Sequence, residues 1–467
     1  MNKILFYLVL FLLASCGEGK NECPTVYFAG EIVNPTSSHV VLYKDDMVID
    51  SAKLDENSRF SFLLDSVDEG LYHFYHEPEV QYIFLERGDS LQIRLNTIDF
   101  DESLIFSGTG EEINNFLLEI FLSNELEEES IASYYWLDPL EFSEKLDSLR
   151  NQKITLLESL MEEVTLTEAQ VDMARASIDF SYYIYKEKYP FYHKKRTGEM
   201  GMDEFPCDFY AYRKSLDFDN RNLTYFRPYY NFMKYHFGNM SYMSCAENCG
   251  IDLHSIKNHL HFTKHTMALI DSMVTQKELR DNLFRNVAMD YLLKVNDTEE
   301  NNKAFIDHFH ELSGNNKHID EITDLYAGIR SMQPDRELPD VKVLDSAGNH
   351  ISIRDIAKDK DVVFYFWWGT QKGHFRNMTK QVAKLSIKHP DKTFVGINLD
   401  TDPLRWISIL ETSNLDKSKQ FRSDNTSELR RALIVDHLNK GVITKDGRIA
   451  NAFANMYTTF QQKDSPQ

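Results

Sequence analysis

The sequence predicts a multidomain α+β protein in which an N-terminal all-β sandwich-like domain, a central helical domain and a C-terminal α/β domain follow one another. Short β-branched and aromatic runs separated by turn residues occupy residues 25–108, which is typical of a small all-β domain. Apolar residues recur at helical spacing through residues 110–330. Two almost uninterrupted apolar runs lie within residues 334–467, as expected of parallel strands that are covered on both faces.

The chain begins with a short, positively charged segment that is followed by the apolar run Ile4–Leu13. This run is too short to span about 30 Å of hydrocarbon as a helix, but it suits the apolar part of a secretory signal. It ends in the motif Leu-Ala-Ser-Cys at Cys16, which resembles the lipobox of bacterial lipoproteins. The resemblance implies a signal peptide over residues 1–15, acylation of Cys16 and a short tether over residues 16–24. An ordinary signal peptide with an incidental cysteine is the alternative.

The expected location is therefore the cell envelope, with the protein held by lipid at the periplasmic face or at the outer-membrane surface. The expected partners are the membrane, through this N-terminal lipid, and an envelope protein or peptide whose identity the sequence does not reveal. With a formal net charge of −22, the chain lacks the basic surface that binding to nucleic acid requires.

The chain has five cysteines, and lipid on Cys16 leaves Cys23, Cys207, Cys245 and Cys249. Disulfides are allowed outside the cytoplasm. Four cysteines permit three pairings, among which the sequence does not choose. Cys245 and Cys249 are interpreted as a structural disulfide or as two structural thiols.

In the first domain, turn clusters such as Asp55–Ser58 and Arg87–Asp89 separate the expected strands. The strands are expected at Val26–Ile32, His39–Tyr43, Met47–Ala52, Arg59–Leu64, Leu71–Tyr75, Tyr82–Leu85 and Leu91–Leu95. The order GEI…VVLY…IDSAKLDENSRFSF…YIFLERGDSLQI…FSGTG resembles an N-terminal domain of unknown function that precedes thioredoxin-like domains in Bacteroidetes lipoproteins. This resemblance carries no catalytic motif.

Capping signatures mark helix starts in the central domain, where a polar side chain precedes Glu or Gln by three residues. These pairs are Asp138 with Glu141, Thr167 with Gln170, and Thr275 with Glu278. The proline-containing and glycine-containing connection over residues 190–250 predicts shorter helices and long loops.

In the last domain, strands are expected at Asp361–Trp367 and Thr393–Leu399, helices at Leu404–Leu410 and Glu428–Ile434, and a hairpin with an Asp-Gly turn at Val442–Ile449. This order is thioredoxin-like. The segment also resembles the TlpA-like thiol–disulfide oxidoreductases of the envelope. The matches are Pro339 with VLDSAGNHISIRDI, Phe366-Trp367, Gly396–Asp400 followed by Trp406, and Lys445–Ile449.

The resemblance implies a Cys-x-x-Cys pair just after Phe366-Trp367. A helix N-terminus would lower the pKa of the first thiol, and the second thiol would resolve the mixed disulfide. Here Gln371 takes the position of the nucleophile and His374 that of the resolving thiol, with Lys372 and Gly373 between them.

No cysteine follows Cys249, and the stretch Leu438–Val442 lacks the proline that the family has there in the cis form. The redox site is therefore degenerate, and no catalytic residue is expected.

Two histidines, His261 and His265, have the i, i+4 spacing of metal ligands on a helix. No carboxylate or cysteine occurs at ligand spacing in the sequence around them, so neither a metal site nor a cofactor is expected. His374 is interpreted as a polar residue that fills the vacated redox site.

The leading hypothesis is an envelope-anchored, non-catalytic protein that acts in binding or assembly. Trp367, Trp368 and Phe375 are the candidate contact residues of its groove, although tryptophans at strand ends often belong to the core. The alternatives are a thiol–disulfide oxidoreductase of the TlpA-like family and a lipoprotein that only spaces or supports its partners.

Overall fold

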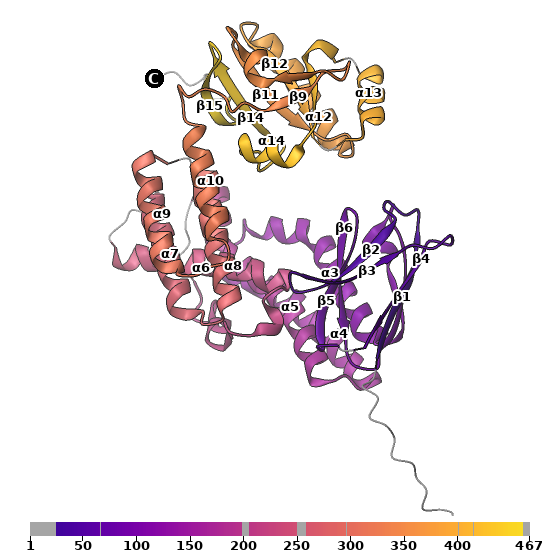
Figure 1. Cartoon of the computed structure of the whole chain (residues 1–467). Helices are drawn as coiled ribbons and strands as arrows, with labels where there is room; N and C mark the ends of the chain where they lie inside the picture. Colours follow the sequence, from indigo (N-terminus) through magenta and orange to yellow (C-terminus); the bar gives the residue numbers. More distant parts are fainter. Residues whose placement is uncertain are drawn as a thin grey trace, which may run out of the picture. The chain divides into compact units, whose positions relative to one another are not determined.

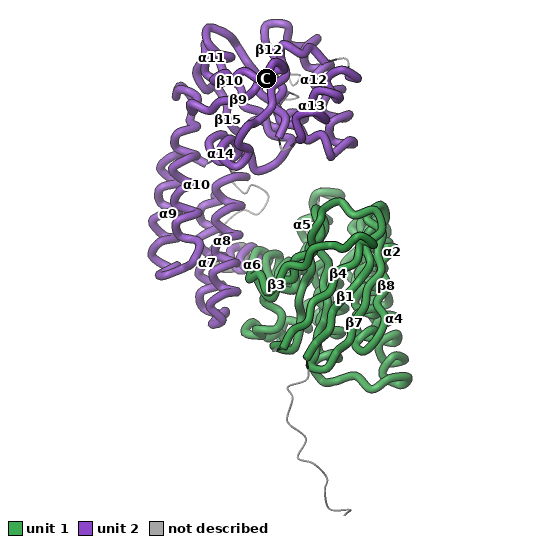
Figure 2. The backbone as a smooth tube through the Cα atoms, turned by 45° about the vertical axis from the view of Figure 1, so that its right-hand side comes forward, with its two compact units in different colours: residues 1–240 green, residues 241–467 purple. Residues whose placement is uncertain are grey.

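The computed structural model describes residues 25–65, 67–198, 205–249, 258–295, 297–399, 401–413 and 415–460. The expected signal peptide, Cys16, the tether and Cys23 lie outside these residues. The chain divides into two compact units, Met1–Met240 and Ser241–Gln467 (Figure 2). The boundary falls inside the segment that the sequence predicts as one helical domain. No helix in the described ranges combines the length and the apolar character needed to cross a membrane.

The first unit contains two four-stranded sheets that share one core. One sheet has the order β4-β1-β7-β8, with β4 at Arg59–Leu64, β1 at Val26–Val33, β7 at Ser90–Asn96 and β8 at Ile105–Thr109. The other has the order β3-β2-β5-β6, with β3 at Met47–Lys53, β2 at His39–Lys44, β5 at Gly70–His76 and β6 at Glu79–Leu85.

Side chains of both sheets meet in this core, among them Phe28, Leu42, Phe62 and Phe74. Burial alternates along β4, as expected of a strand with one face toward a core. The predicted sandwich-like domain is confirmed with all of its expected strands, although β6 begins at Glu79 rather than at Tyr82. The strand β8 was not predicted.

The helices of this unit are α2 (Phe100–Ser103), α3 (Glu111–Tyr134), α4 (Pro139–Glu163), α5 (Glu168–Thr197) and most of α6 (Arg227–Asn248), together with the short 3-10 helices at Ala211–Ser215 and Arg221–Leu223. Both helix caps that the sequence predicts in this unit are present. The Asp138 side chain accepts from the Glu141 amide, and Thr167 forms a reciprocal capping box with Gln170.

The expectation of shorter helices and long loops over residues 190–250 agrees with residues 205–226, which form loops and two short 3-10 helices, but it is wrong at both ends, because α5 continues through Pro190 and α6 is long. Proline has no N–H for the carbonyl four residues earlier. In this helix the Tyr210 hydroxyl donates to that carbonyl, on Lys186, at 3.5 Å. A tertiary contact thus supplies a partner for the carbonyl that Pro190 leaves without one.

The second unit begins with a helical layer of α7 (His259–Met273), α8 (Lys277–Asp290), α9 (Glu299–Ser313) and α10 (Ile319–Ser331), with a π-helical turn at Tyr291–Val295. The predicted cap at Thr275 is wrong by one residue. Gln276 is the N-cap of α8, and its side chain accepts from the Leu279 amide.

A seven-stranded sheet follows, with the order β10-β9-β13-β12-β11-β14-β15. Its strands are β9 (Lys342–Leu344), β10 (His350–Ser352), β11 (Val362–Trp367), β12 (Thr393–Asn398), β13 (Gln420–Ser423), β14 (Lys440–Lys445) and β15 (Arg448–Asn455). The strands β11, β12 and β13 are parallel, whereas β14 pairs with β11 in the antiparallel direction.

The helices of this domain are α11 (Ile353–Ala357), α12 (Lys372–Lys388), α13 (Pro403–Thr412) and α14 (Thr426–Ala432). Figure 1 shows this domain in orange and yellow, with helices α12, α13 and α14 beside its strands. All residues of β11 are buried, which confirms the prediction of a strand covered on both faces. The hairpin turn has positive φ at Asp446 (50°) and Gly447 (77°), as a type I′ turn requires. The strand–helix–strand order with the final hairpin makes this a thioredoxin-like α/β domain. The short strands β9, β10 and β13 were not predicted.

Candidate functional site

The turn between β11 and α12 lies at the position expected of a redox pair. Gln371 is the N-cap of α12, and His374 is its third residue. The turn is fixed to the segment that follows β12, because the Gly369 amide donates to Thr401 Oγ1 at 2.9 Å. A Cβ on Gly369 would lie 2.8 Å from the Thr401 side chain, so this close approach requires glycine.

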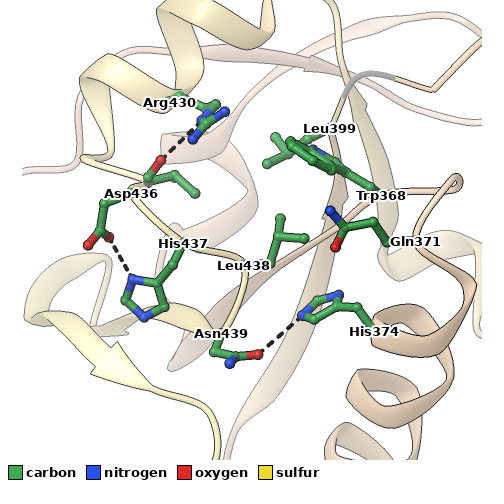
Figure 3. Close-up of a pocket in the computed structure, with 10 residues that line it drawn as sticks. Trp368, Gln371, His374, Leu399, Arg430, Asp436, His437, Leu438 and Asn439 are labelled. Carbon is green, nitrogen blue, oxygen red and sulfur yellow. Dashed lines mark hydrogen bonds and ion pairs between the residues drawn. The ribbon is translucent and has the colours of Figure 1, made fainter. Parts of the chain in front are cut away.

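A cavity of about 240 Å³ opens beside this turn (Figure 3). Its walls come from the β11–α12 turn, the end of β12, α14 and the loop that leads into β14. The lining residues are Trp368, Gln371, His374, Leu399, Arg430, Val435, Asp436, His437, Leu438 and Asn439. Both positions of the degenerate redox pair therefore face one pocket.

His374 bridges the two walls of this pocket. Its Nε2 lies 3.2 Å from Asn439 Oδ1 (Figure 3). Burial lowers the pKa of His374 below its usual value, although the contact with Asn439 acts in the opposite direction. The ring is therefore neutral near pH 7 and donates from Nε2, which leaves Nδ1 as an acceptor.

Two buried polar atoms at the pocket, His374 Nδ1 and Trp368 Nε1, have no hydrogen-bond partner among the described residues. Buried polar groups are rarely left unsatisfied, and each such group costs about 1–3 kcal/mol. Two residues that line the pocket thus each carry a buried polar atom whose hydrogen bond the described fold does not supply.

Charged groups surround the pocket on the side of α14. The Arg430 guanidinium lies 5.9 Å from the centre of the Trp368 ring, and its Nε donates to the Val435 carbonyl. Burial by itself would raise the pKa of Asp436, but the adjacent His437 and the charge of Lys440 hold it below its usual value. The pocket therefore presents an ionised carboxylate and a guanidinium beside an aromatic ring.

Two of the predicted groove residues do not contact this pocket. Trp367 is fully buried, and its Nε1 donates to Gln420 Oε1 at 3.3 Å. Phe375 packs on the Trp367 ring, with the ring centres 4.6 Å apart. Trp367 is a core residue because β11 is buried along its whole length, whereas Phe375 is half-buried on α12 and does not line this pocket. Trp368 alone of the three lines the pocket.

Sequence reasoning missed Arg430 and most of the loop over residues 435–439. These residues approach Gln371 only through the pairing of β14 with β11. In the sequence, only the stretch Leu438–Val442 pointed to this loop, because it lacks the proline found there in the family that the segment resembles.

The lining residues of the pocket include no thiol and no serine or threonine hydroxyl. An amide and a neutral imidazole can hydrogen-bond, but they cannot exchange a disulfide. The side chains at Gln371 and His374 can therefore accept and donate hydrogen bonds but cannot themselves take part in thiol–disulfide exchange.

A second group of chemically reactive side chains lies between α6 and α7. Cys207, Cys245 and Cys249 are free thiols, so of the two interpretations of Cys245 and Cys249, a disulfide or two thiols, the structure has the thiols. Cys245 Sγ lies 2.8 Å from His265 Nδ1 and 3.4 Å from His261 Nε2. Burial and the neighbouring Cys249 raise the pKa of Cys245 to about 11.

No cysteine occurs at ligand spacing from His261 and His265 along the sequence, but two cysteines lie close to them in the structure. The ligand atoms of Cys245, Cys249, His261 and His265 all lie within 4.8 Å of one another. The sequence separates the pairs, and only the packing of α6 on α7 brings them together.

Comparison with protein-family models found no match, and comparison with curated proteins found none either. Among solved structures, the thioredoxin domain of a thiol-disulfide oxidoreductase from Bacteroides vulgatus matches 26% of this chain and 86% of its own, with 20% identity and a TM-score of 0.22. A thioredoxin-like protein from Bacteroides caccae matches 52% of this chain and 86% of its own, with 11% identity and a TM-score of 0.33. At this level of similarity, the thioredoxin-like assignment depends on the sheet topology.

Proposed function

We propose that the protein is a lipid-anchored protein of the cell envelope whose thioredoxin-like domain binds a polypeptide segment and does not exchange disulfides. One observation carries the proposal: Gln371 and His374 occupy the turn where a dithiol would stand, and both line one pocket. Thiol exchange needs an attacking thiolate and a resolving thiol, and neither is present there.

The size and chemistry of the pocket favour a peptide over a large cofactor. Its volume of about 240 Å³ lies below the roughly 300–1,000 Å³ of small-molecule pockets. Leu399, Val435 and Leu438 supply apolar wall. The backbone N–H and C=O of Leu438 make no hydrogen bond to the described residues. An extended peptide could pair with them as a short added strand while a side chain enters the pocket.

The rival function is that of a thiol–disulfide oxidoreductase. Its sulfur would have to come from Cys23, which lies outside the described residues, or from Cys207, Cys245 or Cys249. Burial raises the pKa of Cys245, which disfavours an attacking thiolate at this position in the metal-free protein.

The test combines binding and catalysis on the same purified protein. A randomised peptide library should yield ligands for the wild type. Their affinity should fall at least about tenfold in Trp368→Ala and Gln371→Ala, the size of effect expected when a central contact worth about 1.4 kcal/mol is lost. Leu404→Ala is the matched control, because Leu404 is 82% exposed on α13 and does not line the pocket.

The same preparations should reduce insulin no faster than a buffer blank. Turnover by the wild type that disappears when Cys23, Cys207, Cys245 and Cys249 are changed to serine would establish the rival instead. A Gln371→Cys, His374→Cys double variant serves as a positive control for the position of the turn. Peptides that bind all variants equally would contradict the proposed groove.

A further inference from the structure

The end of α6 and the start of α7 bring together two cysteines and two histidines. Cys245 and Cys249 are one helical turn apart, and the Cys249 amide donates to the Cys245 carbonyl at 3.1 Å. His261 and His265 are likewise one turn apart on α7. Spacing of i, i+4 directs both members of a pair to the same helix face.

We propose that these four side chains form a binding site for one zinc ion, held by two thiolates and two imidazoles. The assignment of zinc follows from the donor set, because S₂N₂ sites with four protein ligands are typical of structural zinc. Two thiolates balance the charge of Zn²⁺, so the occupied site is neutral. The inference does not depend on the proposed function.

The distances agree with such a site before any ion enters. Zn–S bonds of about 2.3 Å and Zn–N bonds of about 2.0–2.1 Å place tetrahedral ligand atoms roughly 3.3–3.8 Å apart. Here Cys245 Sγ lies 3.4 Å from His261 Nε2 and 2.8 Å from His265 Nδ1. No pair of ligand atoms in the cluster is more than 4.8 Å apart. Closure around an ion therefore needs movements of about 1 Å or less.

Packing between the helices positions the ligands. One helical turn before Cys245, the Ser241 hydroxyl donates to the Phe262 carbonyl at 3.1 Å. The Tyr242 and Phe262 rings stack with their centres 6.0 Å apart. Asn258 caps the His261 amide at 3.0 Å, which holds the first turn of α7. A site supported in this way loses little conformational entropy when the ion binds.

The cluster also has a route to solvent. Cys245 is buried, His261 and His265 are partly buried, and Cys249 is exposed. An ion can therefore reach the cluster past Cys249 and then be enclosed. All four coordination positions are filled by the protein, so the expected role is to fasten α6 to α7 rather than to catalyse.

The test is the metal content of the full-length protein, purified in reducing buffer without chelator. About one zinc per chain is expected. Cobalt substitution should produce the thiolate-to-cobalt charge-transfer band and the visible bands of a tetrahedral ion. Cys249→Ser and His261→Ala should each weaken zinc affinity by more than about 100-fold. Loss of a residue that only supports a ligand lowers metal affinity by about 10-fold to 100-fold, and loss of a ligand itself should cost more.

Matched control variants show whether a change in zinc content results from misfolding or from nonspecific metal binding. Cys207→Ser and His310→Ala change exposed residues outside the cluster and should keep full zinc content. A chelator should lower the thermal midpoint of the wild type but not that of Cys249→Ser, whose substituted side chain is exposed. Substoichiometric zinc in the wild type, unchanged zinc in Cys249→Ser, or a Cys245–Cys249 disulfide in protein isolated from the envelope would overturn the proposal.

Discussion

Glu187 and Lys440 are both buried ionisable residues, but their surroundings differ. Glu187 is fully buried and accepts from Arg213 Nε at 3.0 Å, from Asn239 Nδ2 at 2.7 Å and from the His236 ring at 2.7 Å. Burial alone would raise the pKa of Glu187, yet these partners hold it below its usual value. The stability that ionised Glu187 contributes to the folded protein is therefore fully present above the pKa of Glu187 in the unfolded chain. It is lost as the pH falls through the lower pKa of Glu187 in the folded protein.

Lys440, the first residue of β14, has far less compensation. Its ammonium donates to the Ile434 carbonyl and lies 4.4 Å from the centre of the Phe453 ring. Burial lowers the pKa of Lys440 to about 8, although Asp436 acts in the opposite direction. The charged form of this buried side chain therefore destabilises the folded protein.

This shift predicts a pH dependence with a definite sign. Between about pH 8 and 10.5, the unfolded chain binds the Lys440 proton more often than the folded protein does. Stability should therefore rise with pH in this window. In Lys440→Met this rise should disappear, and the free energy of unfolding near pH 7 should increase. Urea unfolding across the window, with the exposed Lys384→Met as control, measures the difference. Parallel pH profiles of wild type and Lys440→Met would refute it.

At the scale of single elements, the start of α5 is the best-defined local structure. Thr167 and Gln170 cap each other's backbone amides, and both side chains also contact Glu86. The Thr167 hydroxyl donates to Glu86 Oε1 at 2.6 Å, and Gln170 Nε2 donates to Glu86 Oε2 at 2.9 Å. The cap thus joins α5 to the segment that follows β6.

Removal of this cap should destabilise the first unit. Thr167→Ala should cost about 1–2 kcal/mol, the upper range for an N-cap, because the contact with Glu86 is lost as well. Thr165→Ala, which lies two residues earlier and is exposed, should be nearly neutral. Chemical denaturation of the two variants gives the comparison. Equal effects of both changes would show that the capping box contributes little.

At the scale of the whole molecule, the membrane association that we propose depends on one residue outside the described part of the chain. The Leu-Ala-Ser-Cys motif resembles a lipobox, and stable anchoring needs more than one acyl chain. Cys16→Ser should release the protein from membranes into the soluble envelope fraction. Fractionation with a control for signal cleavage provides the measurement. Complete membrane retention of the processed variant would exclude anchoring through Cys16.

The sequence by itself determined the features that depend on neighbours a few residues apart. Short β-branched and aromatic runs between turn residues identified the strands of the sandwich, and the caps at Asp138 and Thr167 identified two helix starts. The apolar run before Trp367 identified the buried parallel strand, and the sulfur-free turn at Gln371 and His374 followed directly from the residues. Periodicity and capping are local, so a linear sequence records them.

Only the tertiary structure decided what depends on residues far apart in the chain. It placed Trp367 in the core, Asn439 against His374, and the Tyr210 hydroxyl at the Lys186 carbonyl that Pro190 leaves without an amide donor. It also brought Cys245 close to His265. Because the cysteines and the histidines are separated along the chain, the sequence does not reveal the four-ligand cluster. These contacts arise from the packing of whole elements, which no local pattern specifies.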